Sequence, residues 1–223
     1  METTNIKKIQ SECIVLLHGM GRTKFSMRRV EKHFIEKGYE VFNADYPSTK
    51  LEIEELSNGF LSDLVSKLKK QPIKKLHFVT HSLGGIILRH YLQKNSLPDG
   101  SRVVMLAPPN KGSEVADFLK NNFLYKFSTG KAGQRLTTDK DSLPNNLKEI
   151  DCDVGIIAGS KSMEPWFSFL IHGLNDGKVS VENTKLLEMK DFISMPFSHT
   201  FIMDSKDVIL QVEYFIKNGT FKS

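Results

Sequence analysis

Short apolar runs alternate along the chain with longer stretches in which apolar residues recur at helical spacing. Residues 13–17 form a continuous apolar run, which is typical of a strand buried on both faces, and short strands are also predicted over residues 39–44, 76–80, 102–107, 154–159 and 190–195. Helical periodicity covers residues 24–37, 53–70, 86–92, 114–120 and 205–217. This alternation predicts an α/β fold, a three-layer sandwich in which a mostly parallel sheet of about six strands carries helices on both faces.

The chain has 223 residues and shows neither an internal repeat nor a linker, so we expect a single domain over residues 1–223. Residues 121–150 are polar and lack periodicity, which favours a small lid or a pocket-lining excursion. The apolar side chains in this stretch, Phe123 and Tyr125 among them, either line a pocket or hold the segment against the core.

The segment His81-Ser82-Leu83-Gly84 joins the third predicted strand to a helix. A strand that turns sharply into a helix holds a serine in a strained conformation with its hydroxyl exposed. Gly84 is the small residue that such a turn requires two positions after the serine, whereas Thr80 replaces the usual glycine two positions before it. The backbone N–H of Leu83 would point at the oxygen of an acyl group under attack. The structural alternative is a helix with a serine N-cap.

A serine hydroxyl needs a base to accept its proton, and the base is usually a histidine oriented by a carboxylate. His199 lies between the last predicted strand and the last helix, and Asp176 precedes it. The order Ser82, Asp176, His199 is the one expected after a nucleophile elbow. Glu164 is the second candidate for the acid. The alternatives are a surface histidine for His199 and a plain Asp-Gly turn for Asp176.

Two glycines follow the first predicted strand in His18-Gly19-Met20-Gly21, which indicates a tight loop. The N–H of Met20 would be the second oxyanion donor, unless the loop is simply a glycine turn. Aromatic residues near the expected mouth of the site, Phe123, Tyr125 and Trp166, favour an apolar acyl group.

The composition argues against two classes of protein, those that bind nucleic acids and those that bind metals. The net charge is +5, but the basic residues are scattered without interleaved aromatic residues, which argues against nucleic-acid binding. The two cysteines lack metal-ligand spacing, so we expect no metal and no cofactor. Residues 1–10 are polar and no apolar run approaches about 18 residues, which favours a cytoplasmic protein. Association with a membrane surface through the basic residues and residues 166–169 is a weaker alternative.

Four segments together resemble the α/β-hydrolase fold superfamily, and its small bacterial lipase/esterase-like branch in particular. They are LHGMG at 17–21, THSLGG at 80–85, DGKV at 176–179 and SHT at 198–200, with a further similarity at 107–113. The resemblance implies a minimal form of the fold, without the first two antiparallel strands and without a large cap domain.

The same resemblance implies Ser82 as nucleophile, His199 as general base and then acid, and Asp176 as the carboxylate that orients His199. Met20 and Leu83 would be the oxyanion donors. The implied function is a serine hydrolase that acts on small-molecule or lipid carboxylic esters through an acyl-enzyme intermediate. The alternatives are an acyltransferase that uses the same three residues and a non-catalytic binding module.

Overall fold

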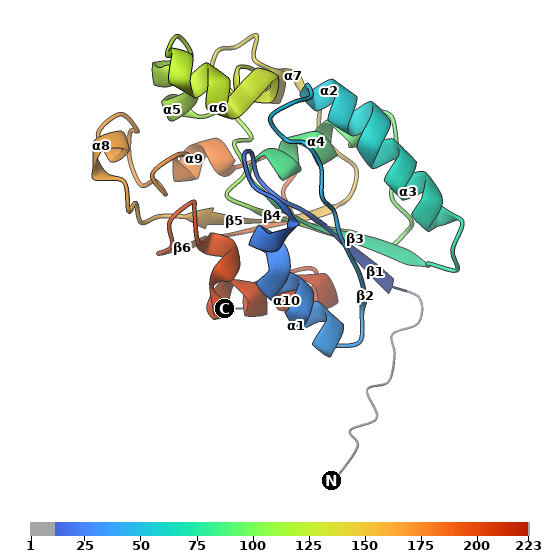
Figure 1. Cartoon of the computed structure of the whole chain (residues 1–223). Helices are drawn as coiled ribbons and strands as arrows, with labels where there is room; N and C mark the ends of the chain where they lie inside the picture. Colours follow the sequence, from blue (N-terminus) through green and yellow to red (C-terminus); the bar gives the residue numbers. More distant parts are fainter. Residues whose placement is uncertain (1–11, 223) are drawn as a thin grey trace.

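A six-stranded parallel sheet forms the centre of the computed structural model, which describes residues 12–222 (Figure 1). The strands are β1 (Glu12–Leu17), β2 (Glu40–Asn43), β3 (Lys75–His81), β4 (Arg102–Leu106), β5 (Asp153–Gly159) and β6 (Asp191–Met195). Their order across the sheet is β2-β1-β3-β4-β5-β6, and every neighbouring pair is parallel. The predicted sheet is confirmed, because each predicted strand end lies within one residue of the observed one.

Helices cover both faces of this sheet (Figure 1). They are α1 (Arg28–Glu36), α2 (Ile53–Glu55), α3 (Ser62–Lys69), α4 (Leu83–Leu92), α5 (Glu114–Leu119), α6 (Phe123–Gly133), α7 (Leu143–Asn146), α8 (Pro165–Ser168), α9 (Val181–Thr184) and α10 (Lys206–Asn218), with the short turns η1 (Lys24–Met27), η2 (Leu56–Leu61) and η3 (Ile202–Asp204). Helices α1 and α10 pack below the sheet, where Phe34 and Phe215 are fully buried. Helices α2 to α4 pack above it in a second apolar cluster. These two layers explain why the strands are apolar on both faces.

The strand order reverses between β1 and β3. The chain leaves β1 through α1 to reach β2 at the sheet edge, and then returns past β1 through α2 and α3 to reach β3. Because such crossovers are right-handed, α1 and α2–α3 lie on opposite faces of the sheet. The loops that follow β1 and β3 therefore emerge side by side, with Leu17 paired to Thr80 at the strand ends. Ligands in this type of sheet bind at such a reversal.

The segment 121–150 differs from its predicted irregular structure, because it contains α6 and α7. Asn122 caps α6, since its side-chain oxygen accepts the N–H of Tyr125. The helix shows no amphipathic periodicity because Phe123 and Phe127 face solvent rather than the core. Gly130 has a φ of 60° inside α6, so the helix is kinked at that residue.

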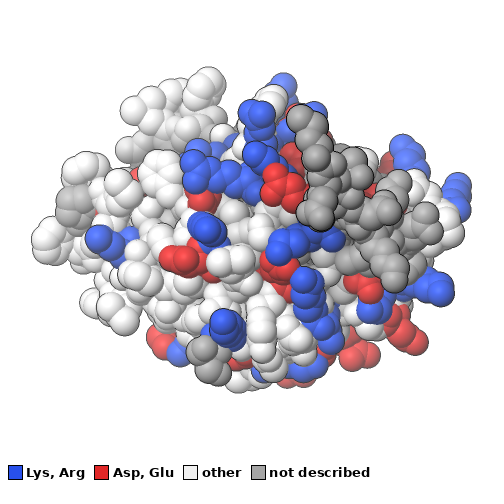
Figure 2. Space-filling model, turned by 90° about the horizontal axis from the view of Figure 1, so that it is seen from below, with Lys and Arg blue, Asp and Glu red and all other residues white. Residues whose placement is uncertain are grey.

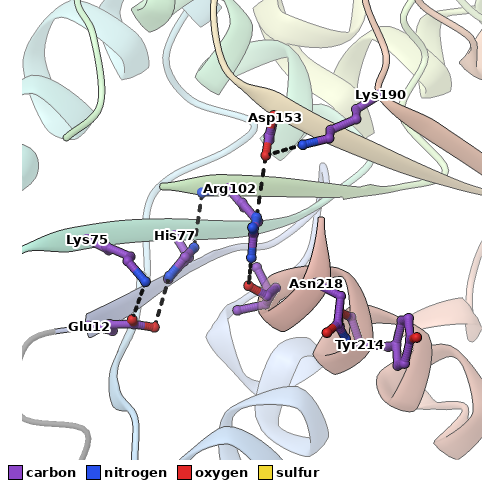
Figure 3. A network of polar contacts seen from close by, with 9 residues as sticks. Glu12, Lys75, His77, Arg102, Asp153, Lys190, Tyr214 and Asn218 are labelled. Atoms are coloured by element: carbon purple, nitrogen blue, oxygen red, sulfur yellow. Dashed lines mark hydrogen bonds and ion pairs between the residues drawn. The ribbon is translucent and has the colours of Figure 1, made fainter. Parts of the chain in front are cut away.

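A buried histidine lies at the amino ends of the strands, at the opposite edge from the carboxyl-end loops (Figure 3). His77 Nδ1 accepts the backbone N–H of Arg102 at 3.0 Å, so Nε2 carries the proton and donates to Glu12 at 3.3 Å. Lys75 also pairs with Glu12, at 2.6 Å. Burial lowers the pKa of His77 to about 4, although the Glu12 carboxylate opposes this shift.

The same network continues from β4 to the last helix (Figure 3). Arg102 donates to the carbonyl oxygen of Ile216 in α10 at 2.7 Å and lies 3.4 Å from Asp153 on β5. Asp153 in turn pairs with Lys190 at 2.7 Å. The network therefore connects β1, β3, β4, β5 and α10 through side-chain contacts.

Positive and negative side chains are interspersed on the face that Figure 2 shows, which is the molecule seen from below. This mixture is typical of a solvated surface rather than of a nucleic-acid interface. Over residues 12–222, none of the helices has the length and apolar character needed to cross a membrane.

Candidate active site

Ser82 occupies the single position between the end of β3 and the start of α4. Its backbone has a φ of 51° and a ψ of −120°, a conformation that costs about 1–3 kcal/mol for a residue with a side chain. The turn is held from both sides, because Ser82 N–H donates to Leu106 on β4 and Ser82 C=O accepts the N–H of Gly85 in α4. The conformation presents the hydroxyl at the carboxyl end of the sheet, as the sequence motif predicts.

Small residues around this turn permit close packing of backbone on backbone. A Cβ atom at Gly84 would lie 2.7 Å from the carbonyl oxygen of Leu17, so only glycine lets α4 approach β1 this closely. Thr80 is fully buried, and a Cβ atom at Gly85 would lie 3.2 Å from its hydroxyl oxygen. Gly85 therefore leaves the room that the threonine side chain needs.

The structure brings Ser82, His199 and Asp176 into a chain of hydrogen bonds. His199 Nε2 lies 3.0 Å from Ser82 Oγ, and His199 Nδ1 lies 2.7 Å from Asp176 Oδ2. All three side chains are buried, Asp176 to 1% exposure. Because Nδ1–H donates to the carboxylate, Nε2 is free to accept the proton of the Ser82 hydroxyl.

The Asp176 carboxylate is fixed by its own loop. Its Oδ1 atom accepts the backbone N–H groups of Lys178 at 2.9 Å and Val179 at 2.8 Å. The backbone N–H of His199 donates to the carbonyl oxygen of Asp176 at 3.0 Å. The Asp-Gly turn thus positions the carboxylate as well as reversing the chain.

The other candidate acid does not reach His199. Glu164 lies 3.9 Å from the Lys178 amine. Asp204, which follows His199 in the chain, lies 3.6 Å from Arg29. Of these carboxylates, only Asp176 contacts the histidine.

A second histidine, His81, forms a hydrogen bond to the backbone of His199. His81 Nε2 donates to the backbone carbonyl of His199 at 2.9 Å, and the two rings are 5.0 Å apart. Burial, reinforced by the nearby His199 ring, lowers the pKa of His81 well below its usual value, so His81 is neutral. The sequence places His81 beside Ser82 but contains no sign of this contact, because the two histidines are 118 residues apart.

The loop after β1 comes very close to Ser82. A Cβ atom at Gly19 would lie 2.7 Å from His81 Nδ1 and 3.3 Å from Ser82 Cβ. Met20 follows Gly19 and lines the same cavity as Ser82. Neither the Met20 N–H nor the Leu83 N–H donates a hydrogen bond to another residue within 12–222. Both amides are therefore available to an oxygen near Ser82.

The contacts of His18 stabilise the loop that follows β1. Its buried ring stacks on Tyr46 with 4.0 Å between ring centroids, and the Tyr46 hydroxyl donates to the His18 carbonyl oxygen. Burial lowers the pKa of His18, so the ring is neutral. Gly21 N–H donates to Ser48 Oγ at 3.0 Å and completes the anchoring of the loop.

A cavity of about 320 Å³ opens at Ser82 and His199. One wall is apolar and is formed by Val115, Ala116, Leu119, Tyr125, Leu136 and Phe167. Tyr125 is therefore part of the cavity, and its role in binding a substrate stays a prediction. The structure differs for Phe123 and Trp166, which are 77% and 66% exposed and lie outside this wall, because α6 and α8 turn them outward.

Exposed apolar side chains from two helical segments project beside the cavity. We call them the apolar rim: Phe123, Leu124, Phe127, Trp166 and Phe169. Tyr125 of α6 and Phe167 of α8 line the cavity itself, so both segments border its opening. Large exposed apolar patches mark sites of interaction.

The sheet order, the Ser82 turn and the placement of the carboxyl-end loops are those of an α/β-hydrolase of the esterase and lipase type. The chain belongs to the family described as "Putative serine esterase (DUF676)", whose model matches residues 7–127, more than half of the sequence. No curated protein matches the sequence.

Solved structures share this fold. The mature lipase BlEst2 of Bacillus licheniformis superposes with a TM-score of 0.77 at 19% identity, over 96% of this chain and 94% of that one. The metagenomic carboxyl esterase MGS0156 has a TM-score of 0.67 at 17% identity, over 87% and 66% of the two chains. The product of gene lin2722 from Listeria innocua has a TM-score of 0.65 at 15% identity, over 96% of each chain.

Proposed function

We propose that the protein hydrolyses carboxylic esters with Ser82 as nucleophile, His199 as base and acid, and Asp176 as the carboxylate that orients His199. The observation that carries this proposal is the hydrogen-bonded series from Ser82 Oγ through His199 to Asp176, buried at the end of an apolar cavity. Membership in the serine esterase family supports the same reaction class.

In the first half of the reaction, Ser82 Oγ attacks the ester carbonyl carbon while His199 Nε2 takes the hydroxyl proton. The oxygen of the tetrahedral intermediate accepts hydrogen bonds from the N–H groups of Leu83 and Met20. The carbon–oxygen bond to the alcohol then breaks, and His199 returns the proton to the departing alkoxide. Ser82 is left as an acyl ester.

In the second half, water attacks the acyl carbon and gives its proton to His199. The bond to Ser82 Oγ breaks, Oγ regains the proton, and the carboxylic acid leaves. The apolar wall accommodates the acyl chain, with Tyr125 as part of it. In this proposal residues 121–150 partly cover the cavity of a single-domain enzyme.

A fluorophosphonate probe tests the nucleophile directly. We expect one adduct per chain by intact mass spectrometry, because an assembled serine and histidine react with the probe whereas ordinary serines do not. The adduct should disappear in Ser82→Ala and persist in Ser96→Ala, which removes an exposed serine just beyond the end of α4. An unlabelled parent protein, or labelling that survives Ser82→Ala, contradicts the assignment.

The same acyl-enzyme also permits acyl transfer if an alcohol replaces water. Product analysis with added glycerol or short alcohols distinguishes the two reactions, because a transferase accumulates a new ester in place of the free acid. A binding module in this fold would form neither product nor probe adduct.

The apolar rim favours a substrate presented at a lipid surface. We expect the protein to sediment with phosphatidylcholine–phosphatidylglycerol vesicles, and Phe127→Ser to weaken sedimentation by about threefold or more, since Phe127 is 82% exposed on the rim. The matched control is Leu210→Ser, which removes an exposed side chain from α10 on the opposite layer. Equal sedimentation of the two variants would exclude a role for the rim.

A further inference from the structure

Two cations, Arg22 and Lys178, line the cavity at Ser82. Arg22 and Lys178 belong to the described lining, which contains no Asp or Glu side chain. Neither cation comes from the apolar wall, because Arg22 follows the loop that bears Met20 and Lys178 belongs to the turn that bears Asp176. The lining of the cavity therefore combines apolar side chains with two positively charged ones.

The backbones of both cations are anchored to the catalytic loops. Arg22 N–H donates to Gly19 C=O at 3.2 Å, within the loop that approaches Ser82. Lys178 N–H donates to Asp176 Oδ1 at 2.9 Å, and Lys178 C=O accepts the hydroxyl of Ser113 at 2.7 Å. These hydrogen bonds thus fix the backbone positions of Arg22 and Lys178 relative to Ser82 and Asp176.

The charges of these two side chains are largely uncompensated within the part of the chain that the structure describes. Arg22 forms no ion pair with a described residue, and Lys178 has only Glu164, at 3.9 Å. A shallow groove lined by Arg22, Asp45 and Lys50 adjoins the cavity. After burial and the His199 ring, Arg22 and Lys178 also contribute to the lowered pKa of His81. Both cations are therefore close enough to influence the charge state of His81, the residue next to Ser82.

We propose that the substrate is an amphiphilic ester in which an apolar acyl chain is linked to an alcohol that carries an anionic group, a phosphate or a carboxylate. The acyl chain lies against the wall formed by α5 and Leu136, and the anion on the alcohol side is bound by Arg22 and Lys178. This inference rests on the proposed ester hydrolysis. It assigns the part of the cavity near Arg22 and Lys178 to the alcohol portion of the ester. A doubly charged phosphate matches two cations better than a single carboxylate does.

Paired esters with the same short acyl chain test the inference. The first pair is 1-butyrylglycerol and 1-butyrylglycerol 3-phosphate, and the second is ethyl butyrate and the butyryl ester of glycolate. Butyrate release gives kcat/KM for each. We expect each anionic ester to exceed its neutral partner by roughly three- to tenfold at low salt, and the preference to shrink at 0.5 M KCl because salt screens exposed charges. The larger of the two ratios identifies the anion.

Variants that remove a single charge test whether Arg22 and Lys178 cause the preference for anionic esters. Arg22→Gln and Lys178→Gln should each lower kcat/KM for the anionic ester about threefold more than kcat/KM for the neutral ester, mainly through KM. Glu164→Gln should act in the opposite direction, because it removes a carboxylate that lies 3.9 Å from the Lys178 amine. Arg28→Gln is the matched control, since Arg28 is an exposed arginine on α1 outside the cavity.

The outcomes separate this inference from the proposed function. Equal kcat/KM for neutral and anionic esters, or equal losses on both esters in Arg22→Gln and Lys178→Gln, would overturn the anionic subsite while ester hydrolysis stands. Absence of hydrolysis of every ester, together with absence of a fluorophosphonate adduct, would overturn the hydrolase itself.

Discussion

Replacing Asp176 with asparagine is expected to lower kcat for ester hydrolysis by about 10⁴-fold while the protein remains folded. In the parent protein, Asp176 Oδ2 accepts the Nδ1 proton of His199 at 2.7 Å. An amide NH₂ at that position would donate instead, which forces the proton of His199 onto Nε2. The histidine could then no longer accept the proton of Ser82. The change is measured as kcat on a neutral butyryl ester near pH 8.

The fold should tolerate this substitution because the remaining oxygen of asparagine still accepts the N–H groups of Lys178 and Val179. The matched control is Glu164→Gln, which removes a nearby carboxylate that does not contact His199. The control should retain parental kcat on the neutral ester. Parental activity in Asp176→Asn, or a comparable loss in Glu164→Gln, would show that another group orients His199.

Acid is expected to destabilise the protein well above the pH at which carboxylates titrate, and His77 should account for about 3 kcal/mol of this effect. The folded protein holds the pKa of His77 at about 4, below its ordinary value of 6.5. Between these two pH values the unfolded chain binds a proton that the folded protein does not. The free energy of unfolding therefore falls as the pH decreases from 6.5 to 4. Burial depresses the pKa values of His81 and His18 in the same direction.

Urea denaturation at pH 7 and at pH 4 measures this difference in stability. His77→Asn should reduce the difference, because the amide oxygen can still accept the Arg102 N–H but the side chain no longer titrates. The variant is expected to be less stable at pH 7, so the change between the two pH values is the informative quantity. His172→Asn removes an exposed histidine and should leave that change as it is. An unaltered pH dependence in His77→Asn would exclude His77 as its source.

The centre of the sheet could be predicted from the sequence because β1, β3, β4 and β5 are buried on both faces and therefore read as mostly apolar runs. The same physics explains where prediction was wrong. Helix α6 buries little of its apolar surface in the core, so its Phe123 and Phe127 gave no helical periodicity. The outward orientation of Trp166 depends on how α8 packs, which no local pattern contains.

The candidate site was predictable to the extent that its residues follow the ends of strands. Ser82 and His199 stand in the expected order at the carboxyl ends of β3 and β6, and the structure brings them to 3.0 Å. Their catalytic roles stay predictions. By contrast, a single arginine or lysine in a loop belongs to no sequence motif that would predict a binding site. Arg22 and Lys178 become visible as a pair only when the loops after β1 and β5 are brought to one cavity.

The charged network at the amino ends of the strands lies far from this cavity. β3 spans seven residues between His81 and the Lys75 end, a distance of roughly 20 Å at about 3.3 Å per residue. That separation exceeds the screening length of about 8 Å at physiological salt. Substitutions in Glu12, Arg102 or Asp153, whose charges are paired with neighbours at that end of the sheet, are therefore expected to change the tolerance of the fold to acid and heat with little effect on the electrostatic potential at Ser82. During evolution, substitutions at the amino ends of the strands can therefore change the stability of the protein, and substitutions at the carboxyl ends can change its ester specificity. The two properties can change independently.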